Sequence, residues 1–289
     1  MKQFAVGYAI LAAALYAVSI PLSKLFLSEV SPLMLSALLY IGSGLGMAAV
    51  GIGQKIRSAK PDGTPFAKSD TPYIVGMVLL NTAALACLML GLTFASASHV
   101  SLLNNLEIAA TAVFAMLFFH EKVSKRLWWA IFLVTAAGVI LSVESGETFS
   151  FSAGSLLVTA ACLFWGLENN CTRVLSERSP LKVSVIKGVF AGLSGLLLAL
   201  LAGEWFPSPS VIPAVLLLGF AAYGLSIFFY ILAQRYLGAA KTSTYYAVSP
   251  FIAAGLSLLI FREVPSLQFL LALVVMALGV YFASTKPSE

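Results

Sequence analysis

Two glutamates lie deep inside apolar stretches of this sequence and are its first candidates for chemistry. Glu107 falls at the middle of the apolar run 98–119, and Glu168 lies about one helical turn from the middle of the run 153–173. An ionisable side chain within a bilayer costs about 3 kcal/mol or more and generally marks a functional site. Because removal from water favours the uncharged carboxyl group, either glutamate could exchange a proton for a cationic or zwitterionic ligand.

Amide side chains flank both glutamates. Asn104 precedes Glu107 by three residues, so the two share a helical face, and Asn105 lies beside that face. Asn169 directly follows Glu168. Amides also form ordinary hydrogen bonds between membrane helices, so these asparagines fit a packing role as well as a binding role.

Aromatic residues occur at a similar depth. Tyr16 and Trp165 lie near the middle of their runs, and Tyr245 and Tyr246 precede Pro250. Pro250 lacks an N–H, so the carbonyl of Tyr246, four residues earlier, loses its usual helical partner. Aromatic faces bind cations or apolar groups, although a single ring is equally explained by packing or lipid contact. A further helical face in the run 212–234 carries Tyr223, Tyr230 and Gln234.

These residues belong to a chain whose composition predicts an all-α integral membrane protein. Charged residues make up 10% of the 289 residues, whereas a soluble domain has about 25%. A helix needs about 20 apolar residues to cross a bilayer. Ten runs meet or approach that length, which predicts ten transmembrane helices: 4–22, 33–53, 72–94, 98–119, 127–143, 153–173, 185–202, 212–234, 241–261 and 266–283.

The basic residues predict the orientation of these helices. With a cytoplasmic N-terminus, all but two of the 17 Lys and Arg residues fall on the cytoplasmic side, the exceptions being Lys24 and Arg262. Cytoplasmic loops are enriched in Lys and Arg, so both termini are expected on the cytoplasmic side. The expected location is the cytoplasmic (inner) membrane, whose lipid surrounds the helices. The net charge of +5 is spread over short loops, so nucleic-acid binding is not expected. The three cysteines lack metal-ligand spacing, and no metal or other cofactor is expected.

An internal repeat divides the chain into two halves. Residues 27–33, Leu-Ser-Glu-Val-Ser-Pro-Leu, reappear 148 residues later at 175–181 as Leu-Ser-Glu-Arg-Ser-Pro-Leu. Residues 117–121, Leu-Phe-Phe-His-Glu, correspond to Leu-Ile-Phe-Arg-Glu 142 residues later. Five helices per half is an odd number, so the second copy crosses the membrane in the opposite direction. We therefore expect two inverted five-helix repeats, 1–149 and 150–289.

With these features the chain resembles the drug/metabolite transporter superfamily, specifically its ten-helix EamA-type members. The resemblance covers essentially the whole sequence, although the run 98–119 has Ile108 where many members have a proline. It implies alternating-access transport, commonly export, of small metabolites such as amino acids. The motifs that carry it are Glu121 and Glu263 at equivalent helix ends, Ala95-Ser96-Ala97-Ser98 and Gly238-Ala239-Ala240 at the helix starts, and Pro250.

The expected function is therefore secondary active transport of a small amino acid, cationic, zwitterionic or drug-like molecule, with protons as the coupling ion. Two alternatives are a membrane-embedded enzyme acting on a lipid or isoprenoid phosphate, and a facilitative channel. The chain shows no acidic cluster of the kind such an enzyme needs, so an enzyme is not expected. In the repeat, Glu107 aligns with Ser249 and Glu168 with Ile20, so the expected site is asymmetric.

Overall fold

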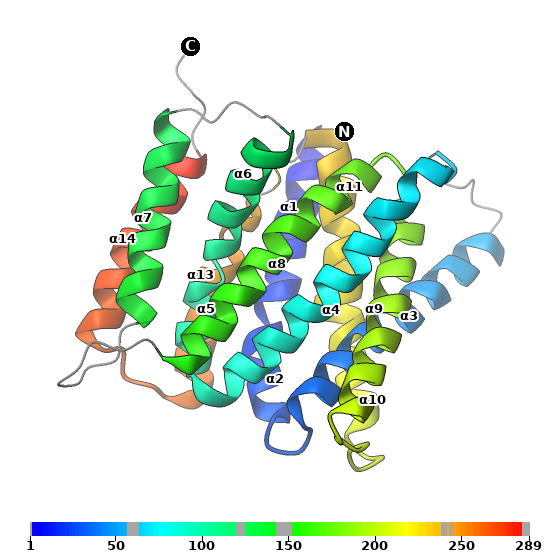
Figure 1. The fold of residues 1–289 in the computed structure, drawn as a ribbon, viewed down its shortest axis with the longest axis horizontal. Helices are drawn as coiled ribbons and strands as arrows, with labels where there is room; N and C mark the ends of the chain where they lie inside the picture. The colour runs from blue at the N-terminus through cyan, green and yellow to red at the C-terminus, as the bar shows by residue number, and fades with distance from the viewer. Residues whose placement is uncertain are drawn as a thin grey trace.

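The computed structural model describes residues 2–56, 64–119, 125–142, 152–237, 242 and 245–284. Within these ranges the regular structure is helical, apart from one isolated bridge between Thr64 and Arg178. Figure 1 shows the helices as one bundle. They are α1 (Lys2–Ala17), α2 (Ser19–Phe26), α3 (Pro32–Ile56), η1 (Lys68–Asp70), α4 (Thr71–Phe94), α5 (Ala97–Leu103), α6 (Leu106–Phe119), α7 (Lys125–Ser142), α8 (Ala153–Leu175), α9 (Pro180–Leu201), α10 (Ile212–Leu218), the π-helix η2 (Gly219–Leu225), α11 (Ser226–Leu237), α13 (Ser249–Phe261) and α14 (Leu267–Ser284).

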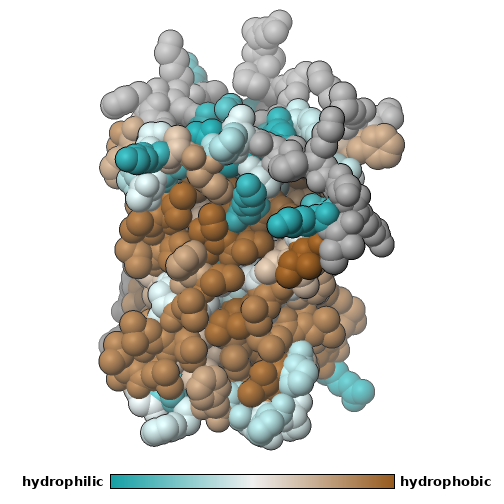
Figure 2. All heavy atoms as spheres, turned by 90° about the vertical axis from the view of Figure 1, so that its right-hand side faces the viewer, coloured by the Kyte–Doolittle hydropathy of each residue, from teal (hydrophilic) through white to brown (hydrophobic). Residues whose placement is uncertain are grey.

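The described helices have the length and apolar surface of a multi-pass membrane protein. Six segments are long and apolar enough to cross a bilayer, and three shorter apolar helices accompany them. Figure 2 shows a broad apolar band between two hydrophilic ends. The start of α1 and the end of α14 lie at the same end of the bundle (Figure 1), as an even number of crossings requires. Ten crossings with cytoplasmic termini remain a prediction.

Helices of the two halves interleave. The most extensive packing joins α3 to α9, α4 to α8, and α7 to α14, while α1 packs on α11 and α5 on α13. Each of these pairs takes one helix from residues 1–149 and one from 150–289. The core therefore forms between the halves, and a cavity in it must draw side chains from both.

Small residues bring α3 and α9 into backbone contact. A Cβ added to Gly188 would lie 2.4 Å from the backbone nitrogen of Gly44, and one on Gly44 would lie 2.5 Å from the backbone nitrogen of Val189. Without a hydrophobic force between helices in lipid, such close approach supplies the packing. The glycines of the segment 42–46 thus serve helix packing.

Two membrane helices are interrupted at nearly equivalent points. A turn at Asn104-Asn105 separates α5 from α6, and a turn at Ala247-Val248 precedes α13. Pro250 explains the second break, because proline cannot donate a helical hydrogen bond. In the first, the Asn105 side-chain amide donates to the carbonyl of Leu102 (3.3 Å) and competes with the helical bond. The first break thus occurs without a proline: asparagines form it, and Ile108 occupies the position where many members of the resembled family have a proline.

Lys187 lies deeper in the bundle than its position in the sequence indicates. Lys187, counted above with the cytoplasmic basic residues, lies two turns inside α9 and is only 5% exposed. A lysine near the start of an apolar run resembles a flanking residue in sequence, but α9 begins seven residues earlier, at Pro180. Residues 120–124 and 238–241, which hold Glu121 and the motif Gly238-Ala239-Ala240, are outside the described residues.

The contact between α3 and α9 predicts that Gly44→Ala destabilises the protein. The added methyl group would overlap backbone that cannot move away, at a cost of about 1–3 kcal/mol. Gly53→Ala, in the same helix, is the matched control, because a Cβ there meets no atom within 4 Å. The midpoints of thermal unfolding of the two purified variants should separate, with Gly53→Ala at or above the original protein. Equal midpoints would contradict the packing role.

Candidate substrate-binding site

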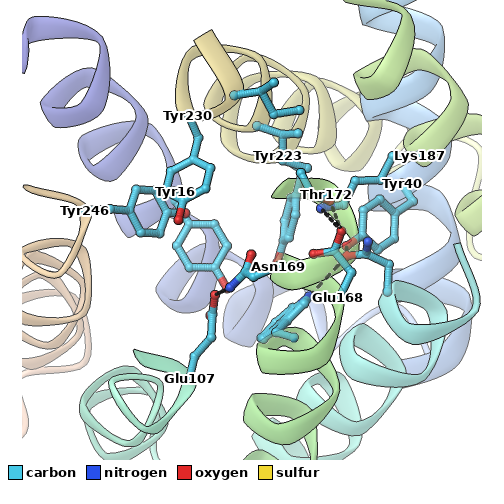
Figure 3. A pocket seen from close by; sticks show the side chains of 14 residues that line it. Tyr16, Tyr40, Glu107, Glu168, Asn169, Thr172, Lys187, Tyr223, Tyr230 and Tyr246 are labelled. Atoms are coloured by element: carbon cyan, nitrogen blue, oxygen red, sulfur yellow. Dashed lines mark hydrogen bonds and ion pairs between the residues drawn. The ribbon is translucent and has the colours of Figure 1, made fainter. Parts of the chain in front are cut away.

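A cavity lies where the two halves meet, with about 530 Å³ of space that no atom fills, including the open space at its mouth. Figure 3 shows that its side chains point inward from helices on several sides. Both candidate glutamates line it. The full lining is Tyr16, Tyr40, Asn81, Glu107, Trp165, Glu168, Asn169, Thr172, Lys187, Tyr223, Ile227, Tyr230, Ile231 and Tyr246.

A second hollow of about 400 Å³ adjoins the first. The two share five lining residues, which are Tyr16, Glu107, Asn169, Tyr230 and Tyr246. The second hollow also reaches both helix breaks, since Asn104, Ile108, Ala247 and Pro250 line it. Glu107 therefore lies at the junction of the two hollows, in the first turn of α6.

Glu107 is held by an amide rather than by a cation. The Asn169 amide donates to its carboxylate (Nδ2–Oε1, 2.7 Å) and to the hydroxyl of Thr111 (3.2 Å). That hydroxyl in turn donates to the backbone carbonyl of Glu107 (2.7 Å). Among the described residues, no lysine or arginine forms an ion pair with Glu107. When Glu107 is ionised, its carboxylate brings a negative charge to the cavity that no ion pair with a described side chain matches.

Glu168 has the opposite environment. Its carboxylate forms an ion pair with Lys187 (Oε1–Nζ, 3.1 Å), and the two side chains are only 1% and 7% exposed. The hydroxyl of Thr172, one turn further along α8, donates to the same oxygen. In Figure 3, Asn169 points toward Glu107 while its neighbour Glu168 points toward Lys187. Helix α8 therefore presents a neutralised carboxylate to α9 and an amide to α6.

Aromatic rings and one further amide form the rest of the wall. Tyr16 packs against Trp165, Tyr223 and Tyr246, with ring centroids 6.4, 5.7 and 5.8 Å away. The oxygen of Asn81 accepts hydrogen bonds from the Trp165 indole (3.2 Å) and from the hydroxyl of Tyr40. These bonds satisfy the polar atoms of Trp165 and Tyr40, so the faces of these two rings can meet a ligand.

Seven of the nine predicted site residues line this space. Tyr16, Glu107, Trp165, Glu168, Asn169 and Tyr246 line the larger hollow, and Asn104 lines the smaller one. The Asn104 amide also donates to the Tyr16 hydroxyl (3.2 Å). The other two residues lie outside both hollows. Asn105 is buried in the helix break, and Tyr245 is 38% exposed.

Several residues that line the cavity are not among the nine predicted site residues. Lys187 lies at the start of the expected helix 185–202 and counts there with the cytoplasmic basic residues, whereas Tyr223 and Tyr230 stand out in the sequence only by their shared helical face. Tyr40 and Asn81 were not considered. A single asparagine within the apolar run 72–94 was a signal for Asn81, by the same reasoning that selected Asn104. Tyr40 had no such signal, because an aromatic residue in a membrane helix is ordinary.

Polar contacts join several helices at the end of the bundle opposite the start of α1. The ammonium group of Lys24, at the end of α2, donates to the carbonyls of Leu92 and Ala95 (3.0 Å to Ala95), where α4 ends. Ser98, at the start of α5, donates to the carboxylate of Glu263, just beyond α13. Four helices of both halves are thus drawn together at this end.

Comparison with known proteins identifies sequences that are similar to this chain. The EamA-like transporter family matches residues 3–143 and again 152–285. An uncharacterized transporter of Methanothermobacter thermautotrophicus is 24% identical over 92% of this chain and 82% of its own length. A probable UDP-sugar transporter of Xenopus tropicalis is 28% identical over 65% of this chain and 63% of its own.

A protein of known crystal structure shares the fold, with a TM-score of 0.72 and 17% sequence identity over 98% of this chain and 97% of that one. The family matches cover both halves and nearly the whole sequence. They agree with the multi-pass helical architecture described above. The chain belongs to the EamA-like transporter family.

Proposed function

We propose that this membrane transporter is a secondary active exporter that moves a small metabolite across the cytoplasmic membrane in exchange for protons. The observation that carries the proposal is the carboxylate of Glu107, which lies at a helix break and without a cationic partner among the described residues. Such a group can hold a proton or a ligand cation, but not both. Broken helices around a central site are typical of secondary transporters.

The position of the cavity supports alternating access. Glu168 lies seven residues before the end of α8, and Lys187 lies seven residues after the start of α9. At about 1.5 Å per residue, both lie roughly 10 Å from the end of the bundle that holds those termini. The opposite end carries the contacts of Lys24 and Glu263. We propose that these contacts close the outer side and break when the site turns outward.

We propose that the transporter consists of two inverted repeats, 1–149 and 150–289, each with five membrane crossings, and that the two ends of the whole chain lie in the cytoplasm. The separate family matches to 3–143 and 152–285 support this division. The pairing of α3 with α9 and of α4 with α8 joins helices of both halves, so we propose that helices of both repeats rock together around the cavity and thereby alternate access.

We propose that the substrate belongs to the group of amino acids, cationic or zwitterionic compounds and drug-like molecules, and is not a nucleotide sugar. A UDP-sugar, named for the Xenopus relative, carries a diphosphate that would meet the carboxylates of Glu107 and Glu168 with only Lys187 as a cation among the lining residues. Membership of a transporter family points away from the alternative of a lipid-phosphate enzyme.

Flux into proteoliposomes tests the coupling role of Glu107. Saturable, pH-gradient-driven uptake is expected for the unmodified protein, and its pH dependence should disappear in Glu107→Gln, because an amide cannot release a proton. Glu29→Gln is the matched control, since Glu29 is exposed in the loop after α2. Ligands for the assay come from a thermal-stability screen of metabolites, where one present at 100 times its Kd adds about 2.7 kcal/mol of stability. Unchanged pH-dependent flux in Glu107→Gln would refute the coupling role.

The proposed opening predicts one-sided labelling of the cavity. In a background with Cys87, Cys162 and Cys171 replaced by alanine, Ile227→Cys places a thiol on the cavity wall, in the first turn of α11, where the side chain is only partly buried. A membrane-impermeant maleimide should label it at least about tenfold faster from the cytoplasmic side than from the outside, because a thiol reacts only where it is accessible. Faster labelling from outside would reverse the proposed orientation of the cavity.

A further inference from the structure

The two cavity glutamates differ in a way that specifies a ligand class, if the proposed transport function holds. We propose that the site selects a monovalent organic amine with an aromatic or bulky apolar body. Its ammonium group pairs with Glu107, and its body lies against the rings of Tyr16, Tyr230 and Tyr246. Glu168 takes no part in the exchange and serves as a positioning residue through its bond to Lys187.

The charges of the cavity wall lead to this assignment. Glu107, Glu168 and Lys187 are the ionisable Asp, Glu, Lys, Arg or His side chains that line the two described hollows. Glu168 and Lys187 cancel each other at 3.1 Å. The remaining charge is that of Glu107, whose side-chain partner is the neutral amide of Asn169. One positive charge on the ligand completes the balance, whereas a buried unmatched charge is strongly unfavourable.

The ion pair is too well enclosed to serve as the exchanging group. Both of its side chains are nearly inaccessible, and Thr172 adds a hydrogen bond to the carboxylate. Taking Glu168 for a ligand would leave Lys187 buried and unpaired, because removing one partner of a buried pair exposes the full cost of the other. The pair connects α8 to α9. It thereby holds the turn of α8 that carries Asn169 in place beside Glu107.

The rings define the rest of the ligand. Tyr230 and Tyr246 lie edge to face at 4.8 Å, and Tyr246 lies 5.8 Å from Tyr16. All three line both hollows together with Glu107. Tyrosine faces attract cations and also provide apolar contact for an organic group.

An amino-acid zwitterion fits this site less well. Its carboxylate would need a second cation near Glu107, and Lys187 is already paired with Glu168. The site therefore favours the amine that lacks the carboxylate.

Three compounds with one aromatic body and different charges test the assignment. Phenethylamine, phenylalanine and 3-phenylpropionate present a cation, a zwitterion and an anion. Binding to the purified full-length protein is measured by calorimetry at a mildly alkaline pH. Phenethylamine should bind about tenfold or more tightly than either other compound, as expected for one charge-assisted hydrogen bond. Its affinity should fall at mildly acidic pH, because protonated Glu107 offers no charge.

Variants separate the roles of the two glutamates. Glu107→Gln should weaken phenethylamine binding about tenfold or more and remove its pH dependence. The double variant Glu168→Gln/Lys187→Met, which removes both charges of the pair, should weaken phenethylamine binding because Asn169 is no longer held beside Glu107, but the amine should remain the tightest of the three compounds. Tyr246→Phe should bind phenethylamine more tightly than Tyr246→Leu, because it keeps the ring. Glu29→Gln is the control for loss of an exposed carboxylate.

Each result bears on one proposal. No binding of phenethylamine, tighter binding of phenylalanine or phenylpropionate, or a preference lost only in the Glu168/Lys187 double variant would overturn the amine assignment. Saturable flux of the zwitterion alone would overturn it as well, while leaving transport itself intact. Phenethylamine binding without gradient-driven flux of any compound would instead sustain the amine site and refute the proposed transport.

Discussion

Lipid offers the backbone no hydrogen bonds, and this constraint governs where the chain can be irregular. In the apolar band every N–H and C=O must find a partner within the protein, so interrupted helices persist only where other protein groups or a cavity face them. The turn at 104–105, the turn at 247–248 and the π-helix 219–225 all border the same two hollows. Irregular backbone and ionisable side chains thus occur together around these hollows.

The same constraint explains why the two buried carboxylates have such different surroundings. A charge far from water must be matched by an opposite charge or by several hydrogen bonds. Lys187 and Thr172 meet this need for Glu168, whereas Glu107 has the amide of Asn169 and faces the cavity. Neither carboxylate has an acidic counterpart in the other half. A nearly symmetric bundle can therefore hold a site whose charges are arranged asymmetrically.

The interleaving of the halves places these groups together. Helices α3 and α9 approach to backbone contact through Gly44 and Gly188, and α4 lies along α8. These close pairs bring Tyr40 and Asn81 from the first half against Trp165 from the second. The cavity wall is thus built from contacts that no single repeat could make alone.

The sequence by itself determined the helical class, the membrane setting and most of the polar residues at the site. It could do so because a polar side chain inside a membrane helix is energetically costly and therefore rare. Glu107, Glu168 and the amides beside them thus stand out in the sequence, whatever the packing of the helices. The tertiary structure alone decided which partner each glutamate has. Lys187 resembled a cytoplasmic flanking residue because its position relative to the membrane depends on where α9 begins, and Tyr40 resembled an ordinary packing residue. Pairing across helices is a property of packing, and a linear pattern does not contain it.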